Sequence, residues 1–189
     1  MRRTRLFAIL LPAPLLALLF GLGSSTLTAC GNGGTGGDCF DYGGFDGMSP
    51  KVTFKADVLP IFRLSCGLSA SCHGSPGGGS LPGQRYYGPS SMDPAPSATD
   101  IKAILAGSVG KASAADPEME VIKAGDPEHS FMMYKLDGDP MAASGVSCAT
   151  LTCAKGMTCL STMPLGGPQL PQDKRDTIRR WIAQGAKND

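Results

Sequence analysis

The chain has 189 residues, and its 17 lysine and arginine side chains balance 16 aspartate and glutamate side chains, giving a formal net charge of +1 at pH 7. This balance excludes the strongly basic footprint typical of nucleic-acid-binding proteins, so we expect no nucleic-acid partner. Glycine (26 residues) and proline (15 residues) are abundant, and aromatic residues make up 6% of the chain. Such a composition predicts a loop-rich domain with short helices.

Residues 1–29 have the pattern of a bacterial export signal. Arginines near the start precede an apolar stretch over residues 6–22. A basic start, an apolar run and small residues before a cleavage site are typical of a secretory signal. The alternative is an uncleaved membrane anchor, which Pro12 and Pro14 inside the apolar stretch disfavour. We therefore predict a lipoprotein signal peptide and an exported mature chain.

The end of this signal, Leu27-Thr28-Ala29-Cys30, resembles a bacterial lipobox, whose cysteine is lipidated and becomes the first mature residue. We expect Cys30 to anchor the protein to a membrane of the cell envelope, with the domain in the periplasm or at the surface. Gly31 after it slightly favours the outer membrane. An exported, oxidising location also suits the other cysteines. The disulfide candidates, whose pairing the sequence leaves open, are Cys39, Cys148, Cys153 and Cys159.

Residues 30–50 are predicted to form a glycine-rich tether, because such a segment buries too little apolar area to offset its ordering entropy. A flexible linker of about 20 residues spans roughly 25 Å, so the domain would stand clear of the membrane. Cys39 within it suggests that a disulfide pins the arm to the domain. The three aspartates of the segment do not follow a calcium-loop spacing, and we expect solvated acids rather than a cation site.

Helical patterns follow in the domain that we predict over residues 51–189. Apolar residues recur at helical spacing over 53–65, with a kink or a new helical start expected at Pro60. The loop over 74–98 contains Tyr86 and Tyr87 as its expected anchors. Thr99 is then predicted to cap a short helix that ends at Gly107. This helix would place Ile101, Ile104 and Leu105 on one face.

The sequence predicts two more helices in the second half of the domain. One begins at Asp126-Pro127-Glu128 and ends at Gly138, with His129 expected to be a surface residue. The other runs from Pro171 to about Gln184, because Ile178, Trp181 and Ile182 form one apolar stripe. In this last helix we expect Arg179 and Arg180 to face outward. Between the two helices, residues 144–168 form a cysteine-rich loop.

The chemistry-bearing stretch is Cys66-Gly67-Leu68-Ser69-Ala70-Ser71-Cys72-His73-Gly74. A cysteine followed directly by histidine, with a second cysteine upstream, is typical of a c-type haem attachment site. Two thiols can add to the two haem vinyl groups, and the adjacent imidazole can bind the iron. Two residues usually separate the cysteines, whereas five separate Cys66 from Cys72.

Several further landmarks fall in a recognisable order. They are Phe54-Lys55-Ala56-Asp57-Val58-Leu59-Pro60-Ile61-Phe62, Cys72-His73-Gly74, Ala124-Gly125-Asp126-Pro127-Glu128-His129-Ser130, Met163-Pro164 and Ile178-Arg179-Arg180-Trp181-Ile182-Ala183-Gln184-Gly185-Ala186. Over roughly residues 54–186 the chain resembles the planctomycete-type cytochrome-c-like domains of exported bacterial proteins. The resemblance implies an all-α cytochrome-c-like domain with long irregular loops, whose first and last helices cross beside a haem cleft. It also implies His73 as the proximal iron ligand, Cys72 as a thioether attachment and Met163 as the distal ligand.

The long spacing leaves three options for the cysteines. If residues 67–71 bulge, Cys66 and Cys72 can both hold haem c. Alternatively, Cys72 alone forms a thioether, since Ser69 occupies the usual position of the first cysteine. In the third option Cys66 and Cys72 form a disulfide and no haem binds. Met141, also in a loop, is a weaker alternative distal ligand.

These observations predict a lipid-anchored monohaem c-type cytochrome-like protein that transfers electrons to a redox partner in the cell envelope. His/Met ligation raises the reduction potential, which suits an electron carrier rather than an enzyme. The sequence shows no defensible catalytic or zinc pattern. The alternative is a haem-free, disulfide-stapled cytochrome-like lipoprotein that acts as a surface binding or structural module.

Overall fold

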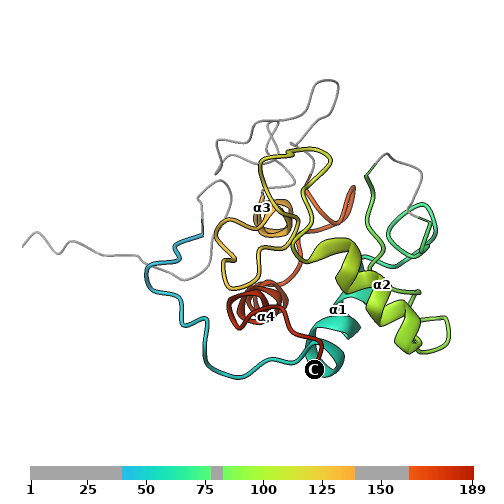
Figure 1. The fold of residues 1–189 in the computed structure, drawn as a ribbon, viewed down its shortest axis with the longest axis horizontal. Coiled ribbons are helices and arrows are strands. Elements are labelled where there is room, and N and C mark those ends of the chain that lie inside the picture. Colours follow the sequence, from blue (N-terminus) through green and yellow to red (C-terminus); the bar gives the residue numbers. More distant parts are fainter. Residues whose placement is uncertain (1–39, 78–82, 139–161) are drawn as a thin grey trace, which may run out of the picture. The chain divides into compact units, whose positions relative to one another are not determined.

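A computed structural model describes residues 40–77, 83–138 and 162–189 (Figure 1). This part contains a π-helical turn η1 (Phe54–Val58) and the helices α1 (Leu59–Ser65), α2 (Ala98–Ser108), α3 (Phe131–Asp137) and α4 (Gln172–Ala183). These residues include isolated β-bridges but no strand, which agrees with the all-α class. None of their helices is long and apolar enough to cross a membrane. The predictions that lie outside the described residues concern the signal over 1–29, Cys30, Cys39, Met141, Cys148, Cys153 and Cys159.

The first helical segment changes its geometry just before Pro60, as the sequence predicts. The η1 turn is wide, and the Val58 N–H donates to the carbonyl of Thr53 at 3.4 Å. Helix α1 then begins at Leu59, so Pro60 lies in its first turn, where a missing N–H costs no helical hydrogen bond. The apolar face predicted for this segment is buried, namely Phe54, Val58, Ile61 and Phe62.

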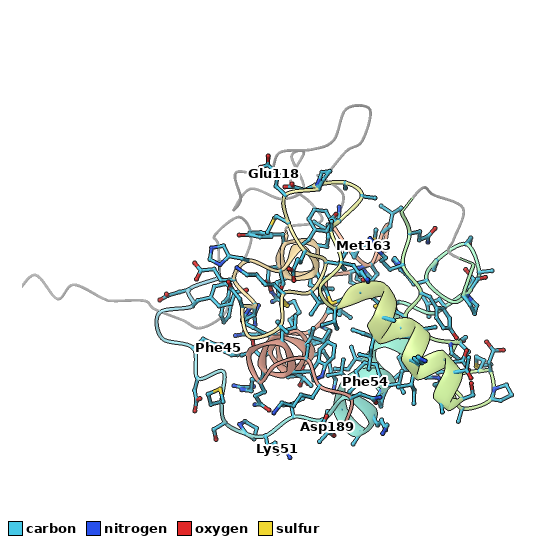
Figure 2. All side chains as sticks on the ribbon, viewed as in Figure 1. Phe45, Lys51, Phe54, Glu118, Met163 and Asp189 are labelled. Atoms are coloured by element: carbon cyan, nitrogen blue, oxygen red, sulfur yellow. The ribbon has the colours of Figure 1, made fainter. Side chains whose placement is uncertain are left out.

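The first and last helical elements pack against each other around Trp181. The indole of Trp181 is 1% exposed, and its ring centroid lies 5.2 Å from that of Phe54 and 6.3 Å from that of Phe62. Asp189 adds polar contacts near the start of η1, where its carboxylate accepts the Phe54 N–H at 3.0 Å (Figure 2). Helix α4 has the predicted extent, with Pro171 and Gln184 as its flanking residues, and the predicted apolar stripe faces the core.

The prediction that Arg179 faces outward is wrong, because its side chain is fully buried. Its guanidinium donates to both carboxylate oxygens of Asp137, at 2.6 and 2.8 Å, and also to Asp176. The ring centroid of Phe40 lies 3.4 Å from the guanidinium carbon. Burial of a guanidinium is tolerated here because carboxylates and an aromatic face replace its water.

Residues 40–50, the second half of the predicted tether, pack on α4 instead of remaining free. Three aromatic rings surround the Arg179 guanidinium, those of Phe40, Tyr42 and Phe45. The Gln184 side-chain amide donates to the carbonyls of residues 47, 48 and 50. These contacts offset the ordering entropy that the glycine-rich composition alone could not.

Helix α2 begins two residues earlier than the Thr99 cap predicts. Ser97 is the N-cap, its hydroxyl accepts the Asp100 N–H, and the Asp100 carboxylate accepts the Ser97 N–H at 2.8 Å. This reciprocal capping box places Thr99 inside the helix. The helix also passes Gly107 and ends at Ser108. The predicted face is confirmed, since Ile104 is buried while Ile101 and Leu105 pack against the core.

Helix α3 begins at Phe131, later than the Asp126-Pro127-Glu128 signal predicts. Those residues form a turn in which the Asp126 carboxylate accepts the His129 N–H at 3.1 Å. The N–H groups of Phe131 and Met132 then donate to the carbonyls of residues 120 and 121, both at 2.9 Å. Pairing with that neighbouring segment holds Ser130 extended and delays the helix. The predicted end at Gly138 is confirmed, and His129 is exposed as expected.

Candidate functional site

Residues 66–74 form a closed turn after α1. The Cys66 N–H ends the helix by donating to the Phe62 carbonyl at 2.8 Å. The chain then folds back, so that the His73 N–H donates to the Cys66 carbonyl at 3.0 Å. Inside the turn, the Ser69 carbonyl accepts from the N–H groups of Cys72, at 3.1 Å, and Gly74, at 2.9 Å. The two cysteines are thus joined by a compact loop with its own hydrogen bonds.

Two glycines allow this turn to close. A Cβ atom on Gly67 would lie 2.4 Å from the Gly88 carbonyl oxygen. A Cβ atom on Gly74 would lie 2.8 Å from the carbonyl oxygens of both Gly67 and Ser69. Real Cβ atoms do not approach oxygen so closely, so both positions require a residue without a side chain. The start of the turn is therefore pressed against the backbone of the 83–90 segment.

His73 is oriented by that same segment. Its Nδ1 lies 2.7 Å from the carbonyl oxygen of Arg85, and the Tyr87 N–H donates to the His73 carbonyl at 2.9 Å. Because a carbonyl can only accept, Nδ1 carries the proton and Nε2 of the neutral ring keeps its lone pair. Burial lowers the pKa of His73, and the hydrogen bond to Arg85 opposes this effect. A histidine fixed by one nitrogen and free to bind through the other is typical of a metal ligand.

The rings around His73 form an apolar wall. The His73 and Tyr87 ring centroids are 4.8 Å apart, and Tyr87 in turn lies 4.9 Å from Phe62. Tyr86 and Tyr87 are both buried, which confirms them as anchors of the loop. The imidazole therefore stands at the edge of the hydrophobic core rather than in the exposed part of the loop.

Cys66 and Cys72 are both free thiols in the structure. Cys66 packs against the hydrophobic core, and burial, with a contribution from Cys72, raises its pKa to about 12. Cys72 lies in the turn beside His73, and its carbonyl accepts from the Gln84 side chain. Free thiols are the form that adds to a haem vinyl group.

Met163 comes from a separate segment of the chain. It packs against the hydrophobic core, and its N–H donates to the Lys135 carbonyl in α3 at 2.8 Å. Figure 2 labels its position beside the core. His73 reaches this core through Tyr87, and Met163 contacts it directly. The structure thus brings Cys66, Cys72 and His73 together in one turn and attaches Met163 to the same core.

Leu64 and Leu68, on either side of Cys66 in the sequence, have apolar side chains that are 61% and 55% exposed. The two thiols and the oriented imidazole are the types of group that covalent attachment and ligation of a haem need. Within residues 40–77, 83–138 and 162–189, no group of three or more histidine, cysteine or acidic side chains could hold a metal ion.

Sequence reasoning missed the Arg85 carbonyl and Gly88, which hold the turn from outside. Both residues act through their backbone carbonyl groups, so the identity of neither side chain indicates this role. The tyrosine pair that follows Arg85 was the available signal, because two aromatic residues in a loop rich in glycine and proline indicate a packed segment.

No protein-family profile, no curated protein sequence and no solved structure matches the chain. Its functional assignment therefore depends on the chemistry of the turn itself.

Proposed function

We propose that this chain is a lipid-anchored, monohaem c-type cytochrome-like protein that transfers electrons. The single observation that carries the proposal is the His73 imidazole, which the Arg85 carbonyl holds at 2.7 Å and which directly follows the free thiol of Cys72 in the sequence. A cysteine and a histidine adjacent in sequence supply attachment and ligation together. The haem would supply an iron centre that gains and loses one electron.

The residues of the turn have separate roles in this proposal. Cys72, with or without Cys66, would hold the haem covalently, and His73 would bind its iron through Nε2. The Arg85 carbonyl fixes the ring orientation and makes the imidazole more basic towards the iron. Burial favours the neutral form of His73, which is the form that binds a metal. Met163, anchored to α3 through its N–H, would supply a sulfur ligand to the iron, which would raise the reduction potential.

The cellular setting follows from the sequence. Cleavage before Cys30 and lipidation of that cysteine would attach the protein to the cell envelope, with the outer membrane slightly favoured. The partner is a redox protein of the envelope, and no nucleic acid is involved. The chain acts as an electron carrier rather than as a catalyst, because its titratable groups form no catalytic constellation that the sequence supports.

The test is to express the full chain in a bacterium that has cytochrome c assembly machinery and to measure its intact mass and its absorption spectrum. We expect the mass of one added haem and a low-spin spectrum in the reduced state. His73→Ala should abolish the low-spin spectrum. The matched control is His129→Ala, which removes an exposed histidine bonded to Asp126 and should leave the spectrum unchanged.

Met163 is tested in the same way. Met163→Ala should lower the reduction potential and remove the distal-ligand signature, whereas Met92→Ala, at a side chain that is 92% exposed, should change neither. A wild-type mass without haem but lacking six hydrogens would mean three disulfides. That result would refute electron transfer and favour the haem-free, disulfide-stapled binding module.

A further inference from the structure

The turn places Ser69, and not Cys66, in register with Cys72. The Ser69 carbonyl accepts the Cys72 N–H at 3.1 Å, which is the i to i+3 closure of a single helical turn. The Ser69 hydroxyl also lies 3.3 Å from the Cys72 nitrogen. Residues three apart in such a turn lie on one face. Ser69 thus stands where the first cysteine of the usual two-residue spacing would stand.

Cys66 lies at the start of the turn, where α1 ends. It ends α1, and its side chain packs against the hydrophobic core. Gly67, directly after it, is pressed against the Gly88 carbonyl, where even a Cβ atom would lie at 2.4 Å. Residues 68–71 are exposed and loop out between the Cys66 carbonyl and the His73 N–H, while Gly67 keeps this contact. The side chain of Cys66 is thus held against the core at the end of α1, whereas Ser69 shares the turn of Cys72.

We propose that Cys72 alone holds the haem, through one thioether, and that Cys66 remains a thiol of the hydrophobic core. This inference rests on the proposed function and deepens it. The Cys72 S–H adds across one haem vinyl group: a carbon–sulfur bond forms, the thiol hydrogen goes to the other vinyl carbon, and the double bond becomes single. No electrons are gained or lost, so the step needs no oxidant. The second vinyl group keeps its double bond.

The experiment uses the full chain, matured with cytochrome c assembly machinery and then denatured and alkylated. Cys66→Ala should keep its covalent haem, whereas Cys72→Ala should lose it. In the wild-type holoprotein, peptide mapping should find the alkyl label on Cys66 and haem on Cys72. The pyridine haemochrome band should lie to the red of that of a two-thioether cytochrome, because one vinyl group stays conjugated with the ring.

Ser69→Cys gives a second, gain-of-attachment test that does not depend on removing a cysteine. It restores the two-residue spacing, so we expect a second thioether and a blue shift of the haemochrome band. Ser71→Cys is the matched control, because each substitution removes the same hydroxyl contact, between Ser69 and Ser71 at 2.8 Å. Position 71 does not have the two-residue spacing from Cys72, so the Ser71→Cys variant should keep the haemochrome band of the wild type.

The outcomes separate the two proposals. Wild-type protein without covalent haem would overturn both. Wild-type protein with haem on both Cys66 and Cys72, or on Cys66 alone, would overturn only the single-thioether inference. A Ser69→Cys band at the wild-type position would likewise overturn the register on which that inference depends.

Discussion

Replacing Asp137 with asparagine removes the anion that two buried arginines share. The Asp137 carboxylate accepts from Arg175 at 2.8 Å and from Arg179 at 2.6 and 2.8 Å. The side chains of Arg179, Arg175 and Asp137 are 0%, 9% and 13% exposed. Removing one partner of a buried ion pair costs about 3–5 kcal/mol, because it leaves a charge without compensation. Asp176 still contacts Arg179, so we expect a loss near the lower end, about 3 kcal/mol.

Urea unfolding followed by the fluorescence of Trp181, the single tryptophan, measures this loss. For a domain of this size the free energy of unfolding changes by about 2 kcal/mol per molar urea, so the midpoint should fall by about 1.5 M. The control is Asp173→Asn, which removes a carboxylate that is 69% exposed and lies 3.3 Å from Lys174. An exposed pair of this kind contributes little, so its midpoint should shift by less than about 0.3 M.

A double-mutant cycle separates the ion pair from other effects of the substitution. In an Arg179→Met background, Asp137→Asn should cost less than in the wild type, with a coupling free energy above about 1 kcal/mol. If the Asp137→Asn variant unfolds at the wild-type midpoint, the buried cluster contributes no net stability. If the coupling free energy is near zero, any loss comes from a source other than the Asp137–Arg179 contact.

Three further perturbations test separate parts of the fold. Ser97→Ala should lower the free energy of unfolding by about 1 kcal/mol, and Thr99→Ala should change it by less than half as much; equal effects would contradict the Ser97 cap. Gly67→Ala should destabilise the domain by about 1–3 kcal/mol. Its control is Gly107→Ala, where a Cβ meets nothing within 4 Å and which should stabilise α2 by about 0.5–1 kcal/mol. A Gly67→Ala variant as stable as the wild type would refute the close packing of the turn. Burial raises the pKa of three tyrosines, Tyr42, Tyr86 and Tyr87. Because the folded state keeps protons that the unfolded chain loses above about pH 10, stability should fall as pH rises, by about 1.4 kcal/mol per pH unit for Tyr87 alone. Tyrosinate absorbance should therefore appear together with loss of helical circular dichroism, and tyrosinate formed before unfolding would contradict the burial.

The helices that the sequence predicts well are those whose signals are local. The stripe of Ile178, Trp181 and Ile182 fixes α4, and Pro60 marks the change from η1 to α1, because spacing and backbone chemistry act within a few residues. The cap of α2 was also within reach. Ser97 and Asp100 have the spacing of a capping box, and Thr99 has no acidic partner three residues later.

Contacts with other segments of the chain explain the features that the sequence predicted incorrectly. Arg179 is charged and looked solvent-facing, yet its partner Asp137 lies 42 residues earlier in the chain. Helix α3 starts late because its first N–H groups bond to residues 120 and 121 rather than within a helix. Likewise, residues 40–50 pack on α4 through an arginine and a glutamine that their own composition does not indicate. In each case a partner outside the element itself decides the local outcome.

The same reasoning applies to the unusual cysteine spacing. The sequence shows five residues between Cys66 and Cys72 where two are usual, and this alone suggests a damaged haem site. In the structure the extra length lies before Ser69, where Gly67 packs on Gly88. The turn from Ser69 to His73 keeps its own closure, and the Arg85 carbonyl holds the imidazole. The longer spacing therefore places Cys66 against the core, while Cys72 and His73 keep the turn and the imidazole orientation that the proposed haem attachment requires.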